Sequence, residues 1–136
     1  MEIVPIDEEY VYDDSVIISQ SSVDGVITYV NRMFCKVSWY TASELVGQPH
    51  SIVRHPDMPK ALFAKMWDTI KTGQVWHGIV KNLRKDGLYY WADTEILPIK
   101  DDNGNITGYI EAKKPASRKD IEENQELYAK MLHAEQ

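Results

Sequence analysis

Several residue types and patterns that would point to a familiar functional class are scarce or missing in this chain. Cysteine occurs once, at Cys35, so the chain cannot form an internal disulfide and has too few thiols for a cysteine-based zinc site. No apolar run approaches the ~20 residues of a membrane span. Basic residues are the minority, 15 against 21 acidic ones with a net charge of −6. This balance argues against non-specific binding to nucleic acid or to an anionic membrane surface.

Motifs of common enzyme and metal-binding classes are missing as well. No glycine-rich loop opens a long helix, and neither H-E-x-x-H nor G-x-S-x-G occurs. The 4 histidines are too scattered to predict a metal site. The stretch from Met1 to Asp14 contains acidic but no basic side chains, which is the wrong charge for a signal peptide. We therefore expect a protein of the reducing cytoplasm that is not an enzyme by itself.

What is present fits one domain of 136 residues, 43% of them hydrophobic. Turn dipeptides such as Asp24-Gly25 and Asn103-Gly104 separate runs of strand-forming residues, which predicts antiparallel hairpins. Apolar side chains at spacings of three and four predict one long helix over 58–72, with Asp57 as its N-cap and Pro59 in its first turn. The expected order is two strands (16–19 and 26–30), two short helices from Asn31 and Thr41, the long helix, three strands (74–84, 88–99 and 106–114) and a last helix (117–134).

The two ends of the chain differ from the strand-rich middle. Residues 1–15 predict an irregular N-terminal cap that packs Ile3, Val4 and Tyr10, with a mobile tail as the alternative. Residues 115–136 predict a linker and helix that either docks on its own domain or serves as an output or dimerisation helix. The expected organisation is therefore a cap (1–15), a sensor domain (16–114) and a C-terminal signalling helix (115–136).

The order of elements over 16–114 resembles the PAS domain, an α+β fold. The motifs that carry the resemblance are V-I-T-Y-V-N from Val26, the stretch from Phe34 to Gly47 with Tyr40-Thr41 and Glu44-Leu45, and K-D-G from Lys85 with Tyr90-Trp91. The resemblance implies a five-stranded antiparallel sheet with short helices on one face. Trp39 stands where the family pattern usually has glycine, which leaves the shape of the pocket near the short helices open.

A narrower resemblance is to the aerotaxis-receptor branch of that family. Its motifs are G-Q-P-H from Gly47, V-R-H-P-D-M-P-K from Val53, Phe63 with Met66-Trp67, and G-I-V-K-N from Gly78. The branch binds FAD non-covalently and senses redox or energy state. The resemblance implies flavin-binding or signalling roles for Arg54, His55, Asp57, Trp67, Asn82 and Asn31. It further implies output by contact with a chemoreceptor-type transducer domain, on the same or a separate chain, and allows a homodimer.

The chemistry of these side chains supports ligand roles and leaves structural alternatives open. Arg54 suits phosphate or carboxylate oxygens, or it pairs with Asp57. His55 could respond to the proton uptake that accompanies flavin reduction, or bond only a backbone carbonyl. Trp67 either contacts a ligand ring or belongs to the core. Asn82 either faces a ligand from its strand or occupies an exposed strand position.

Two other functions stay open. One is a cofactor-free interaction or dimerisation module, whose pocket would be filled by Phe63, Trp67 and Trp39. The other is a haem-binding gas sensor with a histidine as axial ligand. Cys35 lies outside the sequence block that forms a flavin adduct in light-sensing relatives, so we predict no photochemical adduct.

Overall fold

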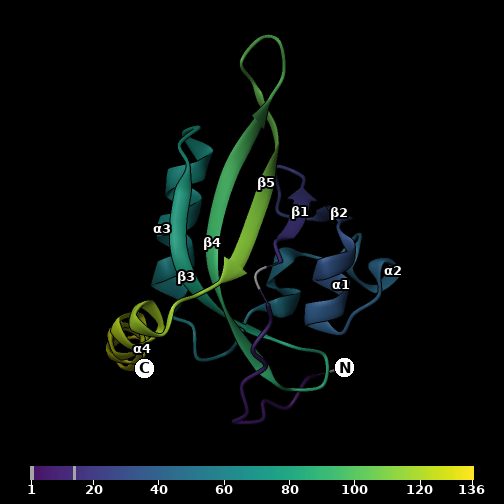
Figure 1. Ribbon diagram of the computed structural model, residues 1–136. Helices are drawn as coiled ribbons and strands as arrows, with labels where there is room; N and C mark the ends of the chain where they lie inside the picture. The colour runs from purple at the N-terminus through teal and green to yellow at the C-terminus, as the bar shows by residue number, and fades with distance from the viewer. Residues whose placement is uncertain (1, 14) are drawn as a thin grey trace.

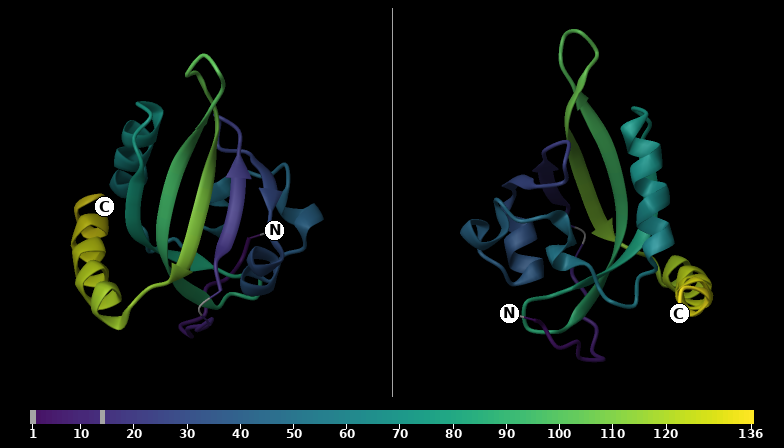
Figure 2. Two further views of the ribbon diagram at one scale, coloured as in Figure 1. Left: turned by 45° about the horizontal axis from the view of Figure 1, so that its top comes forward. Right: turned by 180° about the vertical axis from the view of Figure 1, so that it is seen from behind.

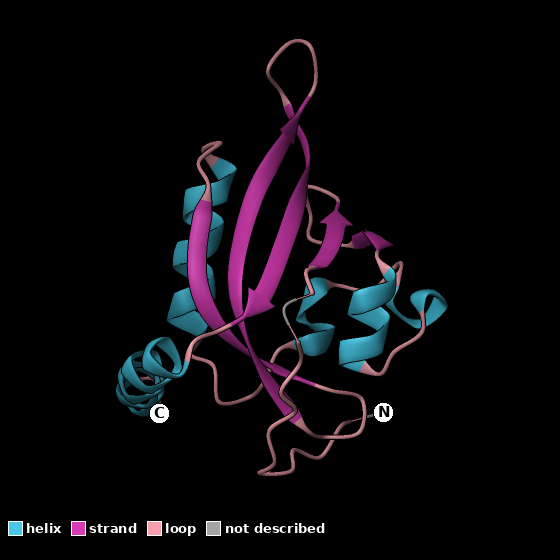
Figure 3. Ribbon diagram, in the orientation of Figure 1, coloured by secondary structure: helices cyan, strands magenta, loops and turns pink. Residues whose placement is uncertain are grey.

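A single antiparallel sheet organises the molecule in the computed structural model, which describes residues 2–13 and 15–136 (Figures 1 and 3). The elements are β1 (Ile17–Ser21), β2 (Ile27–Val30), α1 (Arg32–Ser38), α2 (Ala42–Leu45), η1 (His50–Val53), α3 (Lys60–Lys71), β3 (Trp76–Leu83), β4 (Tyr89–Lys100), β5 (Ile106–Pro115) and α4 (Arg118–Ala134). The 5 strands lie in the order β2-β1-β5-β4-β3, and every neighbouring pair is antiparallel. The expected α+β fold with a five-stranded sheet is confirmed.

The two faces of the sheet carry different partners, as the alternation of side chains along β4 predicts. Helices α1, α2 and α3 lie on one side of the sheet, which Figure 2 shows from behind. Tyr90 and Thr94 point to that side, with exposed fractions of 0% and 1%. Trp91 points to the opposite side, where it stacks on Tyr128 of α4 with ring centroids 6.5 Å apart. The sheet therefore separates an inner space under the short helices from a second contact zone under α4.

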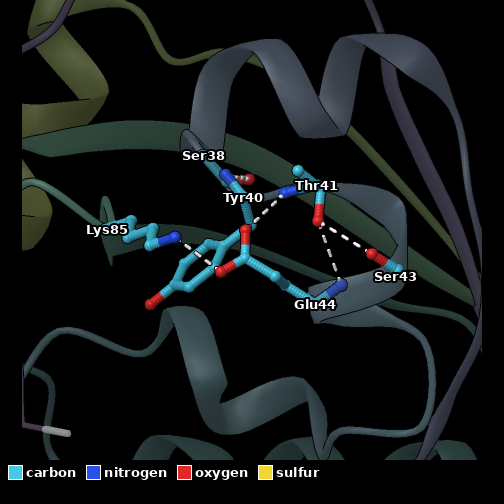
Figure 4. A network of polar contacts seen from close by, with 6 residues as sticks. All are labelled: Ser38, Tyr40, Thr41, Ser43, Glu44 and Lys85. Atoms are coloured by element: carbon cyan, nitrogen blue, oxygen red, sulfur yellow. Dashed lines mark hydrogen bonds and ion pairs between the residues drawn. The ribbon is translucent and has the colours of Figure 1, made fainter.

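Local signals account for the two short helices. Asn31 caps α1 by accepting a hydrogen bond from the backbone N–H of Phe34 at 3.0 Å. Thr41, where the second short helix was expected to start, forms a capping box with Glu44 at the start of α2. Figure 4 shows that the same Glu44 reaches Lys85 of the β3–β4 turn, with 2.5 Å between Nζ and the carboxylate. Lys85 also donates its backbone N–H to the carbonyl of Ser38 at 3.0 Å. These contacts fasten the short helices to the sheet.

The start of α3 differs from the prediction. The helix begins at Lys60, and Asp57 is not its N-cap. Met58 precedes a proline, which disfavours helical backbone at that position, and Pro59 itself is extended with ψ 141°. The first two N–H groups of α3, those of Lys60 and Ala61, instead donate to the carboxylate of Glu135, each at 3.0 Å. A residue 75 positions away in the sequence thus caps this helix.

The N-terminal segment runs along the β3–β4 hairpin. Tyr10 donates its backbone N–H to the carbonyl of Tyr89 at 2.7 Å, and Glu9 forms a parallel bridge with Tyr89. Tyr10 is half-buried as predicted, but Val4 is 76% exposed, and the buried side chain of this segment is Tyr12. Met1 and Asp14, which belong to the predicted cap, lie outside the described residues.

The C-terminal helix docks on its own domain. Ser117 accepts from the N–H of Asp120 at 3.1 Å and so caps α4, as predicted. Ile121 and Tyr128 are buried against the outer face of the sheet, and the hydroxyl of Tyr128 donates to the carbonyl of Ile79 at 2.7 Å. Within residues 2–13 and 15–136, none of the helices combines the length and the apolar character that crossing a membrane requires.

Candidate functional site

A cavity of about 250 Å³ lies between the inner face of the sheet and the segment that connects α2 to α3. Strands β3, β4 and β5 form its floor, α3 and η1 form its walls, and the β1–β2 turn lies at its edge. The lining residues are Asp24, Gly25, Pro49, His50, Ser51, Val53, Arg54, Phe63, Met66, Trp67, Trp76, Val80, Asn82, Thr94, Ile96, Glu111 and Lys113. Such a mixture of aromatic walls and a few convergent polar groups is typical of small-molecule sites.

Helix α3 supplies the aromatic and thioether side of the cavity. Phe63, Met66 and Trp67 face it from successive turns of the apolar stripe that the sequence reveals. Trp67 packs edge-to-face on Tyr109, with ring centroids 5.9 Å apart. A side chain at Gly25 would place its Cβ 3.0 Å from Cζ2 of Trp67, and Gly25 has a φ of +83°. The glycine of the predicted turn therefore also leaves room for the tryptophan ring.

Two polar side chains enter the cavity with unused hydrogen-bonding capacity. Arg54 and Asn82 face each other across an isolated antiparallel bridge. Arg54 Nε and Asn82 Nδ2 are buried, and neither has a hydrogen-bond partner among the described residues. The guanidinium of Arg54 lies over the ring of Phe63, 3.7 Å from its centroid, and burial lowers the pKa of Arg54. Buried donors without partners are rare in folded proteins, so both groups are available to a ligand.

The positions of Asn82 and Arg54 rule out two structural alternatives that the sequence leaves open. Asn82 is 2% exposed, so the exposed strand position is wrong. Arg54 does not pair with Asp57, whose carboxylate binds Lys81 Nζ at 3.0 Å on the other side of the sheet.

A buried group of charged residues occupies the cavity floor. His50 Nε2 lies 2.9 Å from Ser19 Oγ and 3.2 Å from a carboxylate oxygen of Glu111. The other oxygen of Glu111 lies 3.3 Å from Lys113 Nζ, and Lys113 is only 3% exposed. Burial lowers the pKa of His50, Glu111 opposes this effect, and Lys113 adds to it. Burial disfavours the charged carboxylate of Glu111, but His50 and Lys113 outweigh this and lower its pKa.

Three of the predicted site residues lie outside the cavity. His55 is 4% exposed, and its Nδ1 accepts from the backbone N–H of Asp57 at 3.0 Å. Burial lowers the pKa of His55, Lys81 lowers it further, and Asp57 opposes both. The side chain of Asp57 is 62% exposed. The side-chain oxygen of Asn31 caps α1, and its Nδ2 donates to the carbonyl of Val16 at 3.0 Å.

Other residues near the cavity also depart from expectation. Trp39 is 59% exposed and does not line the cavity, so a pocket filled by Trp39 is wrong. Its φ of +69° explains why a glycine suits this position. Glu111 and Lys113 are cavity residues that the sequence motifs do not single out, although they share one face of β5 with Tyr109 and a charged pair on the inner face of a strand is a usable signal. Among the described residues, no cluster of three or more potential ligands could hold a metal ion.

Comparison with known proteins gives one family match and several relatives. Residues 27–112 match the family model described as the PAS fold. The chain is 46% identical over 122 residues to the aerotaxis receptor of Escherichia coli (strain K12), covering 90% of this chain and 24% of the receptor. It is 29% identical over 103 residues to the nitrogen fixation regulatory protein of Klebsiella pneumoniae, covering 76% of this chain and 21% of that protein. The chain thus spans about a quarter of the length of these relatives.

Solved structures show the same fold at low sequence identity. A light-oxygen-voltage domain studied with a flavin analogue has a TM-score of 0.71 at 21% identity, and 88% of each chain is covered. The corresponding domain of the blue-light photoreceptor Aureochrome1, in its light state, has a TM-score of 0.71 at 22% identity, covering 88% of this chain and 89% of that one.

Proposed function

This chain belongs to the PAS family, and we propose that it is the FAD-binding part of a redox sensor of the aerotaxis type. FAD binds non-covalently in the cavity between α3 and the sheet. The domain reports the redox or energy state of the cell to a chemoreceptor-type transducer, on the same or a separate chain. The relatives at 46% and 29% identity are by name a receptor and a regulatory protein, which supports a signalling role rather than catalysis.

The single observation that carries the proposal is the pair of buried donors opposite an aromatic wall. A flavin ring is flat and apolar on its faces, and its pyrimidine edge presents carbonyl and ring-nitrogen acceptors. Asn82 Nδ2 and Arg54 Nε are donors without partners among the described residues. Phe63 and Trp67 line the same cavity. The residues present therefore fit a planar ligand that accepts hydrogen bonds at one edge.

The size of the cavity limits which part of the ligand enters. At about 250 Å³ it lies just below the range of about 300–1,000 Å³ typical of sites for whole drug-sized ligands. The ring system would therefore lie inside, and the nucleotide end of FAD would lie outside. Arg54 follows η1 at the cavity wall and carries a fixed charge, so it also suits negative charge on the ring or on a phosphate.

Bound flavin would supply reversible electron uptake, accompanied by protons. The protein orients the ring through Arg54 and Asn82, and it transmits the change through the sheet and its flanking segments. Such a change alters the protein only if the ligand interacts differently with two protein states. We place the sensor in the cytoplasm and expect its output to be protein contact, with a homodimer as one form that the domain can take.

An absorption spectrum of the freshly purified protein tests this proposal, followed by heat release and chromatography of the ligand. Oxidised flavin bands with FAD released are the expected result. In Trp67→Ala, flavin content should fall sharply while the circular-dichroism spectrum stays unchanged. Trp39→Ala is the matched control, because Trp39 is exposed and outside the cavity. A colourless protein that also fails to bind added FAD contradicts the proposal. Full flavin content in Trp67→Ala removes Trp67 from the site.

A further inference from the structure

The charged group on the cavity floor connects the candidate ligand site to three separate elements. His50 begins η1, Ser19 belongs to β1, and Glu111 and Lys113 belong to β5. Ser19 and Lys113 are almost fully buried, at 1% and 3% exposure, and the side chains of His50 and Glu111 are 18% and 15% exposed. A buried set of titratable groups that lines a ligand cavity needs an explanation, because each charge costs desolvation free energy.

The ring nitrogen Nε2 of His50 has two polar neighbours on the cavity floor. An ionised carboxylate only accepts hydrogen bonds, and Nε2 is the ring nitrogen that faces Glu111 at 3.2 Å. The hydroxyl of Ser19 also lies 2.9 Å from Nε2 and can either donate or accept there, so the ring can take a further proton with Glu111 beside it as acceptor. While His50 is neutral, the charges of Glu111 and Lys113 cancel, and the floor of the cavity carries no net charge.

We propose that His50 is the protonation site of this cavity, which takes a proton from solvent when the bound flavin is reduced. This inference rests on the proposed function. Bound flavin would take up two electrons from an external donor together with one proton, which would leave one negative charge on the ring, and the ring of His50 would take up a second proton. The net charge of the cavity is then the same before and after reduction.

Other charged groups around the cavity determine how strongly His50 responds to the charge of the ligand. Asp24 lines the cavity at the β1–β2 turn, and Arg54 lines it after η1. The Arg54 cation compensates part of the negative charge on a reduced ring, but it cannot change its protonation. Lys113 opposes protonation of His50 and Glu111 favours it. His50 is the group in the set whose ordinary pKa lies near neutral pH, so it is the one that can follow the charge of the ligand.

The test is a titration of the histidine rings in the FAD-loaded protein by nuclear magnetic resonance, first oxidised and then reduced with dithionite. We expect the pKa of His50 to rise on reduction by about one unit or more, a tenfold gain in proton affinity. His77 is the internal control, because its side chain is 60% exposed on the outer face of the sheet beside Asp93. The ring resonances of His77 should be the same in the oxidised and the reduced protein.

A second measurement counts protons taken up from a weakly buffered solution on reduction. At a pH between the pKa values of His50 in the oxidised and reduced protein, His50→Gln should take up fewer protons per FAD than the wild type, by about half a proton for a rise of one unit, while His77→Gln should match the wild type. An unchanged pKa of His50 in protein that holds reduced FAD overturns this proposal and leaves the proposed function intact. A protein that binds no flavin refutes the proposed function and this proposal together.

Discussion

Replacing Arg54 with methionine should change ligand affinity and the stability of the ligand-free protein in opposite directions. Arg54 Nε is buried without a hydrogen-bond partner among the described residues. Arg54→Met keeps an unbranched side chain but removes the guanidinium together with its contact over the ring of Phe63. The ligand-free protein then no longer buries an unsatisfied donor, whereas the ligand loses a charged hydrogen-bond donor.

The contacts of the guanidinium give the size of both changes, in the free energy of unfolding and in the affinity for FAD. A buried unsatisfied polar group costs about 1–3 kcal/mol, and the contact of the cation with Phe63, 3.7 Å from the ring centroid, returns about 0.5–2 kcal/mol. We expect Arg54→Met to raise the free energy of unfolding of the flavin-free protein by about 1 kcal/mol. A hydrogen bond from a charged group contributes about 1.5–3 kcal/mol, so the dissociation constant for FAD should rise about 10- to 150-fold.

The assay is urea unfolding of flavin-free protein together with titration by FAD, and Arg84→Met is the matched control. Arg84 is a buried cation, 5% exposed, whereas Arg54 is half-buried, and Arg84 donates two hydrogen bonds to Asp86, at 3.0 and 2.6 Å. Its removal should destabilise the protein by about 1–3 kcal/mol and leave FAD affinity unchanged, because Arg84 does not line the cavity. The reasoning is refuted if Arg54→Met destabilises the flavin-free protein as much as Arg84→Met does.

Two further predictions concern the flavin-free protein. Its free energy of unfolding should be constant above about pH 7 and should fall as the pH drops below about 6.5. Burial lowers the pKa values of His50 and His55, so the unfolded chain binds protons there that the folded chain does not, at up to about 1.4 kcal/mol per pH unit for each histidine. Urea unfolding at several pH values measures this slope, and a rise in stability toward pH 5.5 would contradict it. Trp39→Gly should stabilise the protein by about 1 kcal/mol in thermal unfolding, because φ +69° strains a bulky residue and the ring is 59% exposed. The guanidinium of Arg84 lies 5.3 Å from the centroid of the Trp39 ring, and a loss of stability would mean that this contact outweighs the strain.

The sequence predicts those parts of the fold whose causes are local. The Thr41–Glu44 capping box, the two faces of β4 and the Asn31 cap all follow from residues within a few positions of one another. The start of α3 could not be predicted in this way, because Glu135 caps that helix from the other end of the chain. No signal near Pro59 indicates this contact.

The candidate site shows the same limit at the level of single residues. The resemblance assigns roles in flavin binding or signalling to Arg54, His55 and Asp57 of the R-H-P-D segment. Of these only Arg54, which has extended backbone and forms a bridge with Asn82, lines the cavity. Successive side chains in an extended segment point in opposite directions, so Arg54 enters the cavity while His55 turns away from it. The cavity floor combines residues from elements far apart in the sequence, namely His50 of η1 and Glu111 and Lys113 of β5. Only the pairing of the strands brings these residues close together. The spacing of these residues in the sequence does not predict that they lie close together.

Strand β3 connects the cavity to the C-terminal helix by the same alternation. Asn82 faces the cavity, and the preceding Lys81 faces outward, where its Nζ binds Asp57 at 3.0 Å. Two residues earlier, the carbonyl of Ile79 accepts the hydroxyl of Tyr128 from α4 at 2.7 Å. A ligand that draws Asn82 inward would therefore act on the Lys81–Asp57 pair and on the attachment of α4 in one movement. The attachment of Tyr128 to the strand that carries Asn82 suits the predicted role of α4 as a signalling helix.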